Sequence, residues 1–359
     1  MSGIVSYGVA IPRCRIAAQE ILNVWKNTHM HILERMGYQE RAVLYPDQDS
    51  VTLAIDACLQ AVERSGIPAT EIDALVFGSG TNPYQTKASA TIIAEALGLR
   101  KDIVSFDLQF SGKSGTTAMI AAKALVDSGQ ARYALAIGSD TINRHIPPGH
   151  QLEYGASAAA VATLIGTQKV IANIVGSVSY AQDQADYFRV EGERYIQVGS
   201  GMIGYVSSWG VQHNVVPAGK KLFEKLGITS EDLNACALHQ HSFVVPMLIS
   251  GPLKLNVREH VLPYILTPYI GDCGAASSLI PLAYILDEGE TDRKILLASY
   301  GSGAGSDCIY IETTSELAQF PNEEDAVIDL FEDKIMLDYG TAQKYEYKYI
   351  RGNLISGAL

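Results

Sequence analysis

The sequence lacks three features, and each absence excludes a class of function. Its five cysteines are odd in number and show neither a CxxC pair nor Cys and His at zinc-site spacing, so we expect reduced thiols and no metal. No apolar run approaches the roughly 20 residues that cross a bilayer, and the opening MSGIVSYGVAIP lacks the charged and apolar parts of a secretory signal. We therefore expect a cytoplasmic protein without a membrane partner.

Positive charge is scarce as well. Lys and Arg number 27 against 39 Asp and Glu, which gives a formal net charge of -12. Nucleic-acid binding draws its affinity largely from cations that neutralise phosphates, so we expect no nucleic-acid partner. What the chain does contain is apolar material: 47% of its 359 residues are hydrophobic, enough for a large core and two lobes.

The order of the expected elements occurs twice, at an offset of roughly 160 residues. In the first half a strand, a helix, a strand, a strand-corner-helix unit and a strand fall at 3 to 12, 50 to 66, 72 to 80, 103 to 129 and 131 to 140. In the second half the same series falls at 170 to 180, 216 to 228, 233 to 241, 264 to 289 and 293 to 307. Gly-bounded apolar runs that alternate with amphipathic helices indicate mixed sheets buried on both faces.

This repeat predicts an α/β fold of two pseudo-symmetric halves, residues 1 to 168 and 169 to 314, followed by an extension at 315 to 359. Any α/β protein can produce similar alternation by chance. The order, the spacing and the Gly-marked corners agree together, however, which favours a duplication.

Two corners, SGKSG at 111 to 115 and GDCGAAS at 271 to 277, stand at the amino ends of expected helices and should face each other. The first also contains the letters of a phosphate loop. A Walker A loop needs Gly five positions before the Gly of GK, and Asp107 holds that position. A carboxylate there would repel phosphate, so we do not expect nucleotide binding.

Several segments resemble the thiolase-fold condensing enzymes. They are GSGTNPYQTKASATIIAEALG at 78 to 98, FSGKSGTTA at 110 to 118, LHQH at 238 to 241, GDCGAAS at 271 to 277 and SYGSGAGSD at 299 to 307. The sequence is similar to archaeal-type 3-hydroxy-3-methylglutaryl-CoA synthases and to the ketoacyl synthase III-like (FabH-like) subunit of the monoacetylphloroglucinol acetyltransferase complex. The resemblance implies a duplicated αβαβα thiolase fold with two mixed five-stranded sheets, and a homodimer.

In such enzymes a thiolate at a helix amino terminus takes an acyl group from a thioester, and polar groups stabilise the oxyanion. This sequence departs from the pattern. The synthases resemble FACKAGT where this chain has FSGKSGT, so Gly112 occupies the Cys position. Gly80 stands at the acid/base Glu position and Asp272 at the Asn position, whereas His239 is retained. No nucleophile is therefore expected at the usual place.

The resemblance offers a task for such a chain. It implies a non-nucleophilic subunit of a C-acetyltransferase that acylates a phenolic ring in a Friedel–Crafts manner, in antibiotic biosynthesis. The implied partners are a Cys-bearing thiolase-like subunit and a small zinc-ribbon/OB-fold bridging protein, which would hold any zinc. We expect this chain to bind no cofactor tightly and to be inactive alone. Its His239 departs from that subunit.

Two other functions stay open. The chain could be a self-sufficient synthase-like or ketoacyl synthase III-like condensing enzyme with an atypical nucleophile, either Cys273 or a serine. Ser111 and Ser114 lie in the first corner, where they would also line the oxyanion pocket, but they lack an evident general base. It could also be a scaffold without chemistry.

Three single residues each have two possible roles. His239 could be an acid/base group or a hydrogen-bonded core histidine, and His241 would share its strand face. Cys273 stands at a helix amino terminus, which lowers a thiol pKa, but beside Asp272, which raises it; it is a relocated nucleophile or a buried thiol. By resemblance Gly303 would line the oxyanion side of the pocket, and it could equally belong to a tight turn.

The remaining cysteines carry weaker expectations. Cys14, Cys58 and Cys236 lie in apolar sequence and should be packing residues, and Cys308 is ambiguous.

The tail alternates Tyr345, Tyr347 and Tyr349 with Glu346 and Lys348. Period-2 alternation places the three rings on one face of an expected strand, and tyrosines suit binding surfaces. We predict a docking surface for the bridging partner; the alternative is a strand that covers the chain's own core.

Overall fold

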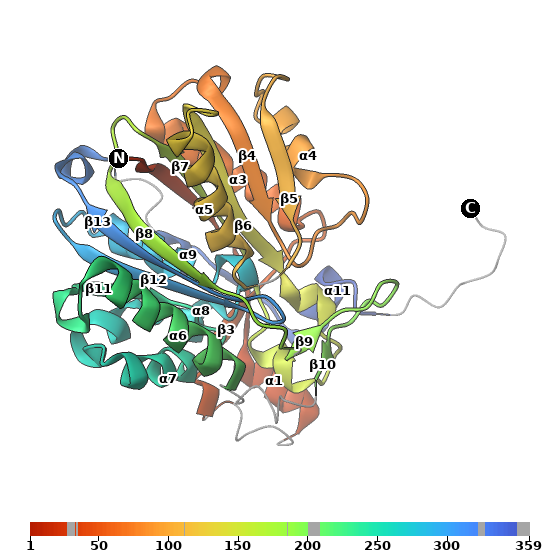
Figure 1. Cartoon of the computed structure of the whole chain (residues 1–359). Helices are drawn as coiled ribbons and strands as arrows, with labels where there is room; N and C mark the ends of the chain where they lie inside the picture. The colour runs from red at the N-terminus through yellow and green to blue at the C-terminus, as the bar shows by residue number, and fades with distance from the viewer. Residues whose placement is uncertain are drawn as a thin grey trace.

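The computed structural model describes residues 1–26, 33, 35–110, 112–184, 186–199, 209–321 and 327–349, and nine of its strands form one mixed sheet (Figure 1). The strand order is β11-β12-β13-β8-β1-β7-β6-β4-β5. These strands are β1 (Gly3–Ala10), β4 (Ile72–Gly78), β5 (Val104–Leu108), β6 (Tyr133–Thr141), β7 (Ala158–Gly166), β8 (Ala172–Tyr180), β11 (Ala235–Leu238), β12 (Lys294–Gly301) and β13 (Gly305–Thr313). Two small sheets join β9 (Tyr187–Phe188) to β10 (Gln197–Val198), and β2 (Cys14–Ala17) to β3 (Glu40–Val43) and β14 (Ile335–Met336).

Each half of the chain supplies one side of the large sheet. Strands β5, β4, β6, β7 and β1 come from the first half, and β8, β13, β12 and β11 come from the second. The two sets meet where β1 pairs with β8, at Gly3 with Asn173 and at Ile4 with Ala172. The strands of the two halves are therefore continuous across a short junction.

The helices form three layers around these strands (Figure 1). Apolar residues of α3 and α4 pack on one outer face, those of α6 and α7 pack on the other, and those of α5 and α9 pack between the two halves. The αβαβα fold that the sequence implies is thereby confirmed. The helices are α1 (Ala18–Trp25), α3 (Ser50–Ser65), α4 (Ser89–Ala96), α5 (Ser114–Asp127), α6 (Trp209–Leu226), α7 (Val244–Leu253), α8 (Thr267–Ile270), α9 (Leu279–Asp287), α10 (Asp329–Glu332) and α11 (Tyr339–Tyr345).

No helix in the described part of the chain combines the length and the apolarity that a membrane span requires.

Asp107, the residue that disfavoured a phosphate loop, lies near the end of β5 and caps α4. Its carboxylate accepts the backbone N–H groups of Ser89 and Ala90, each at 2.8 Å. A negative charge at the first turn of a helix satisfies free N–H groups, so Asp107 has a structural role.

One expected strand is replaced by helical turns. The segment at 264 to 289 should open with a strand, but short helical elements, including α8, take its place. The side chain of Gln240 supplies the bonds that a neighbouring strand would make: Nε2 donates to the Tyr264 carbonyl at 2.9 Å, and Oε1 accepts from the N–H groups of Leu266 and Thr267 at 2.7 and 3.0 Å. The second half thus contributes four strands to the sheet rather than five.

The expected strand in the tail is also wrong. Tyr345 ends helix α11 and is half-buried against the core, and the residues after it turn. Burial still alternates, but in the opposite sense to a covering strand: Glu346 and Lys348 are 0% and 5% exposed, whereas Tyr347 and Tyr349 are 51% and 57% exposed. The charged side chains therefore face inward, and the docking role of the rings stays a prediction.

Candidate active site

The corner that carries the nucleophile in the resembled enzymes is packed backbone against backbone. Gly112 has a φ of 75°, in the left-handed region that glycine adopts most easily, just before α5 begins at Ser114. A Cβ at Gly112 would overlap the Tyr300 carbonyl oxygen and would lie 2.9 Å from the Gly301 Cα. Position 112 therefore has no room for a side chain. Replacing Gly112 by Cys would not by itself restore a cysteine site, because the backbone around residue 112 would also have to move.

Asp307 holds the start of α5 in this position. The carboxylate is fully buried and pairs with the Lys113 ammonium at 3.2 Å. It also accepts hydrogen bonds from the hydroxyls of Thr116, Thr117 and Ser179 at 3.0, 2.6 and 2.7 Å. The lysine of the GKS string thus binds a carboxylate of the second half of the chain.

His239 lies behind the same corner. Its side chain is 2% exposed, its ring centroid lies 5.7 Å from that of His241 and 6.0 Å from that of Tyr300, and its Nδ1 has no hydrogen-bond partner among the described residues. Burial, and then the neighbouring His241, lower the pKa of His239 well below its ordinary value. His239 is therefore a neutral imidazole near pH 7.

Tyr300 continues this group of rings. Its hydroxyl donates a hydrogen bond to the Asp186 carboxylate, and burial together with that bond raises the Tyr300 pKa. In the described residues no cluster of three or more His, Cys, Asp or Glu side chains could hold a metal ion.

Gly80, which stands at the acid/base position, is bonded to a different carboxylate. The N–H groups of Gly80 and Thr81 donate to Asp140 Oδ1 at 2.9 and 3.0 Å, and the Ala275 N–H donates to Asp140 Oδ2 at 2.8 Å. Asp140 is fully buried and ties loops of the two halves together. The two corners do face each other, because a Cβ at Gly115 would lie 2.5 Å from the Ala275 carbonyl oxygen.

Asp272 and Cys273 occupy the second corner. Asp272 Oδ1 accepts the Gly274 N–H at 3.0 Å, and its own N–H donates to the Gly155 carbonyl at 2.6 Å. Cys273 is fully buried; burial, and then the Asp272 carboxylate, raise the pKa of its thiol. A protonated thiol without access to solvent is a poor nucleophile, so the structure favours a packing role for Cys273.

The other corner residues offer no activated group within the described residues. Ser111 lies outside those residues. Ser114 is fully buried and its Oγ has no hydrogen-bond partner among the described residues, so no described base contacts it. Gly303 lies in the turn between β12 and β13, as one expectation had it, and its N–H donates to the Gln184 carbonyl at 2.8 Å rather than pointing free toward an oxyanion.

The remaining cysteines are packing residues. Cys14, Cys58 and Cys236 are buried as expected, and Cys308 is buried as well. Burial raises the pKa of the Cys308 thiol to about 12.

A cavity of about 360 Å³ opens beside Gly80 and gives the site its substrate-sized space. The hairpin of β9 and β10 supplies part of its wall. Arg189 is the charged side chain that lines it, and no carboxylate of the described residues does so. The residues that line the cavity include Gly80, Gln109, Phe110, Ile142, Tyr187, Phe188 and Arg189. The cavity can therefore take a partly apolar ligand with a negative or polar end.

The sequence pointed to Gly80, Gly112 and His239, but it did not assign Asp140, Asp186, Tyr300 or the anchoring role of Asp307. Asp307 ends the quoted motif SYGSGAGSD, so a signal for it was available. Asp186 belongs to no motif, and its partner Tyr300 is 114 residues away in sequence.

Comparisons with known proteins give three findings. A family model described as thiolase, N-terminal domain, matches residues 37–160. The hydroxymethylglutaryl-CoA synthase of Archaeoglobus fulgidus is 36% identical over 348 residues, which cover 97% of this chain and 99% of that protein. The corresponding synthase of Pyrococcus horikoshii is 35% identical over 350 residues, with 97% of each chain covered.

Two solved structures share the fold. A structure of HMG-CoA synthase complexed with CoA matches with a TM-score of 0.84 and 18% identity, covering 97% of this chain and 91% of that one. The 3-oxoacyl-(acyl carrier protein) synthase III of Pseudomonas aeruginosa PAO1 matches with a TM-score of 0.78 and 19% identity, covering 88% of this chain and 98% of that one.

Proposed function

Since the chain belongs to the hydroxymethylglutaryl-CoA synthase family, we propose that it takes part in acyl condensation without carrying the acyl group on residue 112. The observation that carries this proposal is the lack of space for any Cβ at Gly112. The synthase relatives support a synthase-like condensing role better than the phenolic C-acetyltransferase role implied by the sequence resemblance. The phenolic acceptor stays a prediction.

In the proposed reaction the acyl group remains on a thiol outside residue 112. That thiol belongs to an acyl carrier such as coenzyme A or to a Cys-bearing thiolase-like partner. With a phenol, the ring carbon attacks the thioester carbonyl, the new C–C bond forms, the C–S bond breaks, and the released thiol takes the proton that the ring loses. With acetoacetyl-CoA, the methyl carbon of the acetyl thioester loses a proton and adds to the keto carbonyl, and the new alkoxide takes a proton. Water then breaks the C–S bond of the acetyl thioester and leaves a carboxylic acid and a free thiol. The cavity beside Gly80 would hold the reacting groups, with Arg189 and Gln109 as polar contacts.

A second candidate is a self-sufficient condensing enzyme with its own atypical nucleophile. The retained His239 and the 36% identity over nearly the whole chain favour it. All five thiols are buried, and burial raises the thiol pKa of Cys58, Cys236, Cys273 and Cys308. Ser111, which lies outside the described residues, is therefore the first nucleophile to test for this second candidate.

Radiolabelled acetyl-CoA separates the two candidates. The purified chain and its Ser111→Ala variant are incubated with the label, precipitated and mapped by peptide mass. We expect no covalent acetyl group on either. A stable adduct on the unmodified chain would overturn the proposal, and its loss in Ser111→Ala would establish the second candidate.

Product formation supplies the positive arm. A Cys-bearing thiolase-like protein from the same source is added, with acetoacetyl-CoA or a phenol as the acceptor. We expect product only with both proteins present, and the acceptor that reacts identifies the substrate class. If the chain adds nothing to the partner's rate and coenzyme A does not bind it in calorimetry, the protein is a scaffold instead. Co-purification tests the predicted bridging protein separately.

A further inference from the structure

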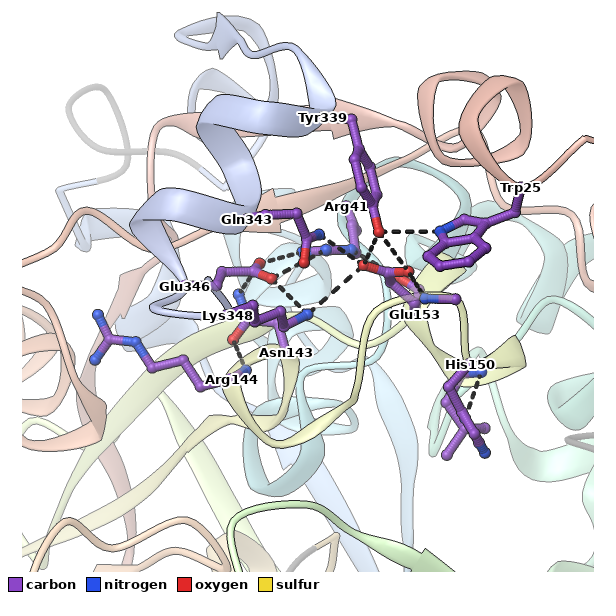
Figure 2. A network of polar contacts seen from close by, with 12 residues as sticks. Trp25, Arg41, Asn143, Arg144, His150, Glu153, Tyr339, Gln343, Glu346 and Lys348 are labelled. Atoms are coloured by element: carbon purple, nitrogen blue, oxygen red, sulfur yellow. Dashed lines mark hydrogen bonds and ion pairs between the residues drawn. The ribbon is translucent and has the colours of Figure 1, made fainter. Parts of the chain in front are cut away.

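Two charged residues that follow helix α11 pack against two charged residues of the first half and form a cluster of four buried charges (Figure 2). This buried charge cluster consists of Arg41, Glu153, Glu346 and Lys348, whose side chains are at most 1% exposed. Arg41 binds the Glu346 carboxylate with both terminal nitrogens at 2.5 and 3.3 Å. The Lys348 ammonium lies 2.7 Å from Glu346 and 3.7 Å from Glu153.

Neutral groups complete the coordination of Glu153 (Figure 2). Gln343 Nε2 donates to Glu153 Oε1 at 2.6 Å, and the Tyr339 hydroxyl donates to the same carboxylate at 3.2 Å. The indole N–H of Trp25 donates to the Tyr339 hydroxyl at 3.0 Å. The two cations and two anions balance, and a balanced, hydrogen-bonded group is the condition under which buried charge is tolerated.

Glu346 also reaches two elements that form the cavity wall. Its carboxylate accepts a hydrogen bond at 3.0 Å from Asn143, which follows the cavity residue Ile142. Its backbone carbonyl accepts one at 3.0 Å from the guanidinium of Arg194, in the loop between β9 and β10. Glu346 does not line the cavity, but it contacts two segments that do: the one that contains Ile142 and Asn143, and the β9–β10 hairpin.

The same loop has further bonds on this side and at its base. The Ile196 N–H donates to the His145 carbonyl at 2.8 Å, and His145 Nδ1 lies 2.9 Å from the Arg194 carbonyl oxygen. His145 itself lies two residues after Asn143. At the base, the N–H groups of Asp186 and Tyr187 donate to the Ser302 hydroxyl at 3.2 and 3.0 Å. The base is thus fixed to the β12–β13 turn, whereas the far end is fixed to the segment that Glu346 holds.

We propose that Glu346 and Arg194 are positioning residues of the cavity: the buried charge cluster fixes the C-terminal segment, and Arg194 fixes the β9–β10 hairpin to it. The assignment of the cavity to substrate rests on the proposed function, whereas the mechanical link does not. The C-terminal extension is then a part of the substrate site rather than an appendage.

Hydrogen exchange of backbone amides, read by mass spectrometry, tests the link. The variants are Arg194→Met, which removes an exposed side chain, and Glu346→Gln, which removes one buried charge. The control is Arg13→Met: Arg13 is also exposed and ties the same extension to the body through Asp333 at 2.6 Å, but outside the cluster. Loss of one charge-assisted hydrogen bond should speed exchange in residues 187–198 about tenfold in Arg194→Met.

We expect Glu346→Gln to speed exchange both in the hairpin and in residues 142–154, and Arg13→Met to change neither. Unchanged hairpin exchange in Arg194→Met, or an equal increase in Arg13→Met, would overturn the proposal. If Glu346→Gln does not fold, Arg194→Met alone decides it.

Calorimetric binding of coenzyme A supplies the second readout. Arg194→Met should weaken binding several-fold while leaving the thermal midpoint close to that of the parent, because a surface contact adds little stability. If coenzyme A does not bind the parent protein, coenzyme A is ruled out as the acyl carrier of the proposed function, while the exchange result still tests the link. Faster hairpin exchange with unchanged coenzyme A affinity would overturn the positioning role.

Discussion

The corner at Gly112 and the buried charge cluster are both closed to solvent, but they are built from opposite materials. At the corner, Gly112 packs against the Tyr300 carbonyl, and the reactive side chains of the resembled enzymes are absent. In the cluster, four charged side chains pack against each other with their charges paired. One region is limited by space, and the other is limited by charge balance.

Relative to a cysteine enzyme, the chain lacks the nucleophile at the corner but has buried ion pairs that fix the segments around the cavity. A corner without a side chain cannot hold an acyl group, whatever its surroundings. A paired cluster of buried charges contributes no chemistry at a carbonyl, but it fixes the parts that surround the cavity. The comparison therefore predicts that substitutions at the corner act through steric overlap and those in the cluster through unpaired charge.

The largest effect is expected from Arg41→Met. It leaves Glu346 buried with one cation fewer, and breaking a buried pair typically costs about 3–5 kcal/mol. The double variant Arg41→Met/Glu346→Met removes one charge of each sign and should lose clearly less than the sum of the two single changes. Urea unfolding measures all three proteins.

Arg13→Met is the matched control, since its ion pair with Asp333 is exposed and such pairs contribute about 0–1 kcal/mol. Additive losses in the double variant would show that the cluster is not held by charge pairing.

A cysteine restored at the corner should be the next most harmful change. Gly112→Cys adds a Cβ that overlaps the Tyr300 carbonyl, and overpacking together with a left-handed φ should cost about 3 kcal/mol. Gly129→Cys is the matched control because Gly129 has nearly the same φ, 74°, and no atom within 4 Å of a Cβ. It should cost about 1 kcal/mol from backbone strain alone.

Thermal unfolding and acetyl-CoA labelling check this pair together. We expect a lower midpoint for Gly112→Cys than for Gly129→Cys, and no acetyl group on the new thiol. Equal midpoints, or rapid acylation of Cys at 112, would show that the corner opens and that space is not what limits it.

The resemblance to condensing enzymes implied the thiolase fold and the retained His239. Local pattern alone predicted the α/β class and the order of most elements, because each strand and helix carries its own periodicity, and it identified the two corners and their approach. It failed where a distant side chain replaces a local signal. Gln240 supplies the bonds that turn the segment after residue 264 away from a strand, and nothing in that segment reveals it.

The tail failed for a related reason. The alternation of Tyr347 and Tyr349 with Glu346 and Lys348 was visible and predicted a strand with its rings on a docking face. It did not show that the chain would turn after α11 or that the two charged side chains would be buried. The partners of the inward-facing charges are distant in sequence: Arg41 lies 305 residues before Glu346, and Glu153 pairs with Lys348 from the other end of the first half. Sequence pattern cannot show such non-local contacts. A single sequence gives the inventory of charges but not their pairing.

The smallest effect separates the two regions by pH. Because burial and His241 lower the pKa of His239, the folded state binds fewer protons than the unfolded state below about pH 6.5. Stability should therefore be complete above the ordinary histidine pKa and fall as the pH drops below it, by about 1 kcal/mol per pH unit from this residue. The buried charge cluster loses stability only at lower pH. Although burial raises the pKa of Glu346, Arg41 and Lys348 hold that pKa below its ordinary value, so the contribution of Glu346 to stability is lost only as the pH falls through the lowered pKa.

Urea unfolding of His239→Leu at pH 7 to 5 tests this ordering. Its stability should depend less on pH than that of the parent protein. His145 contributes to the same slope in both proteins, because burial lowers its pKa to about 4. An unaltered slope in His239→Leu would mean that His239 gains a proton without unfolding, and that the corner is more open to water than its packing indicates.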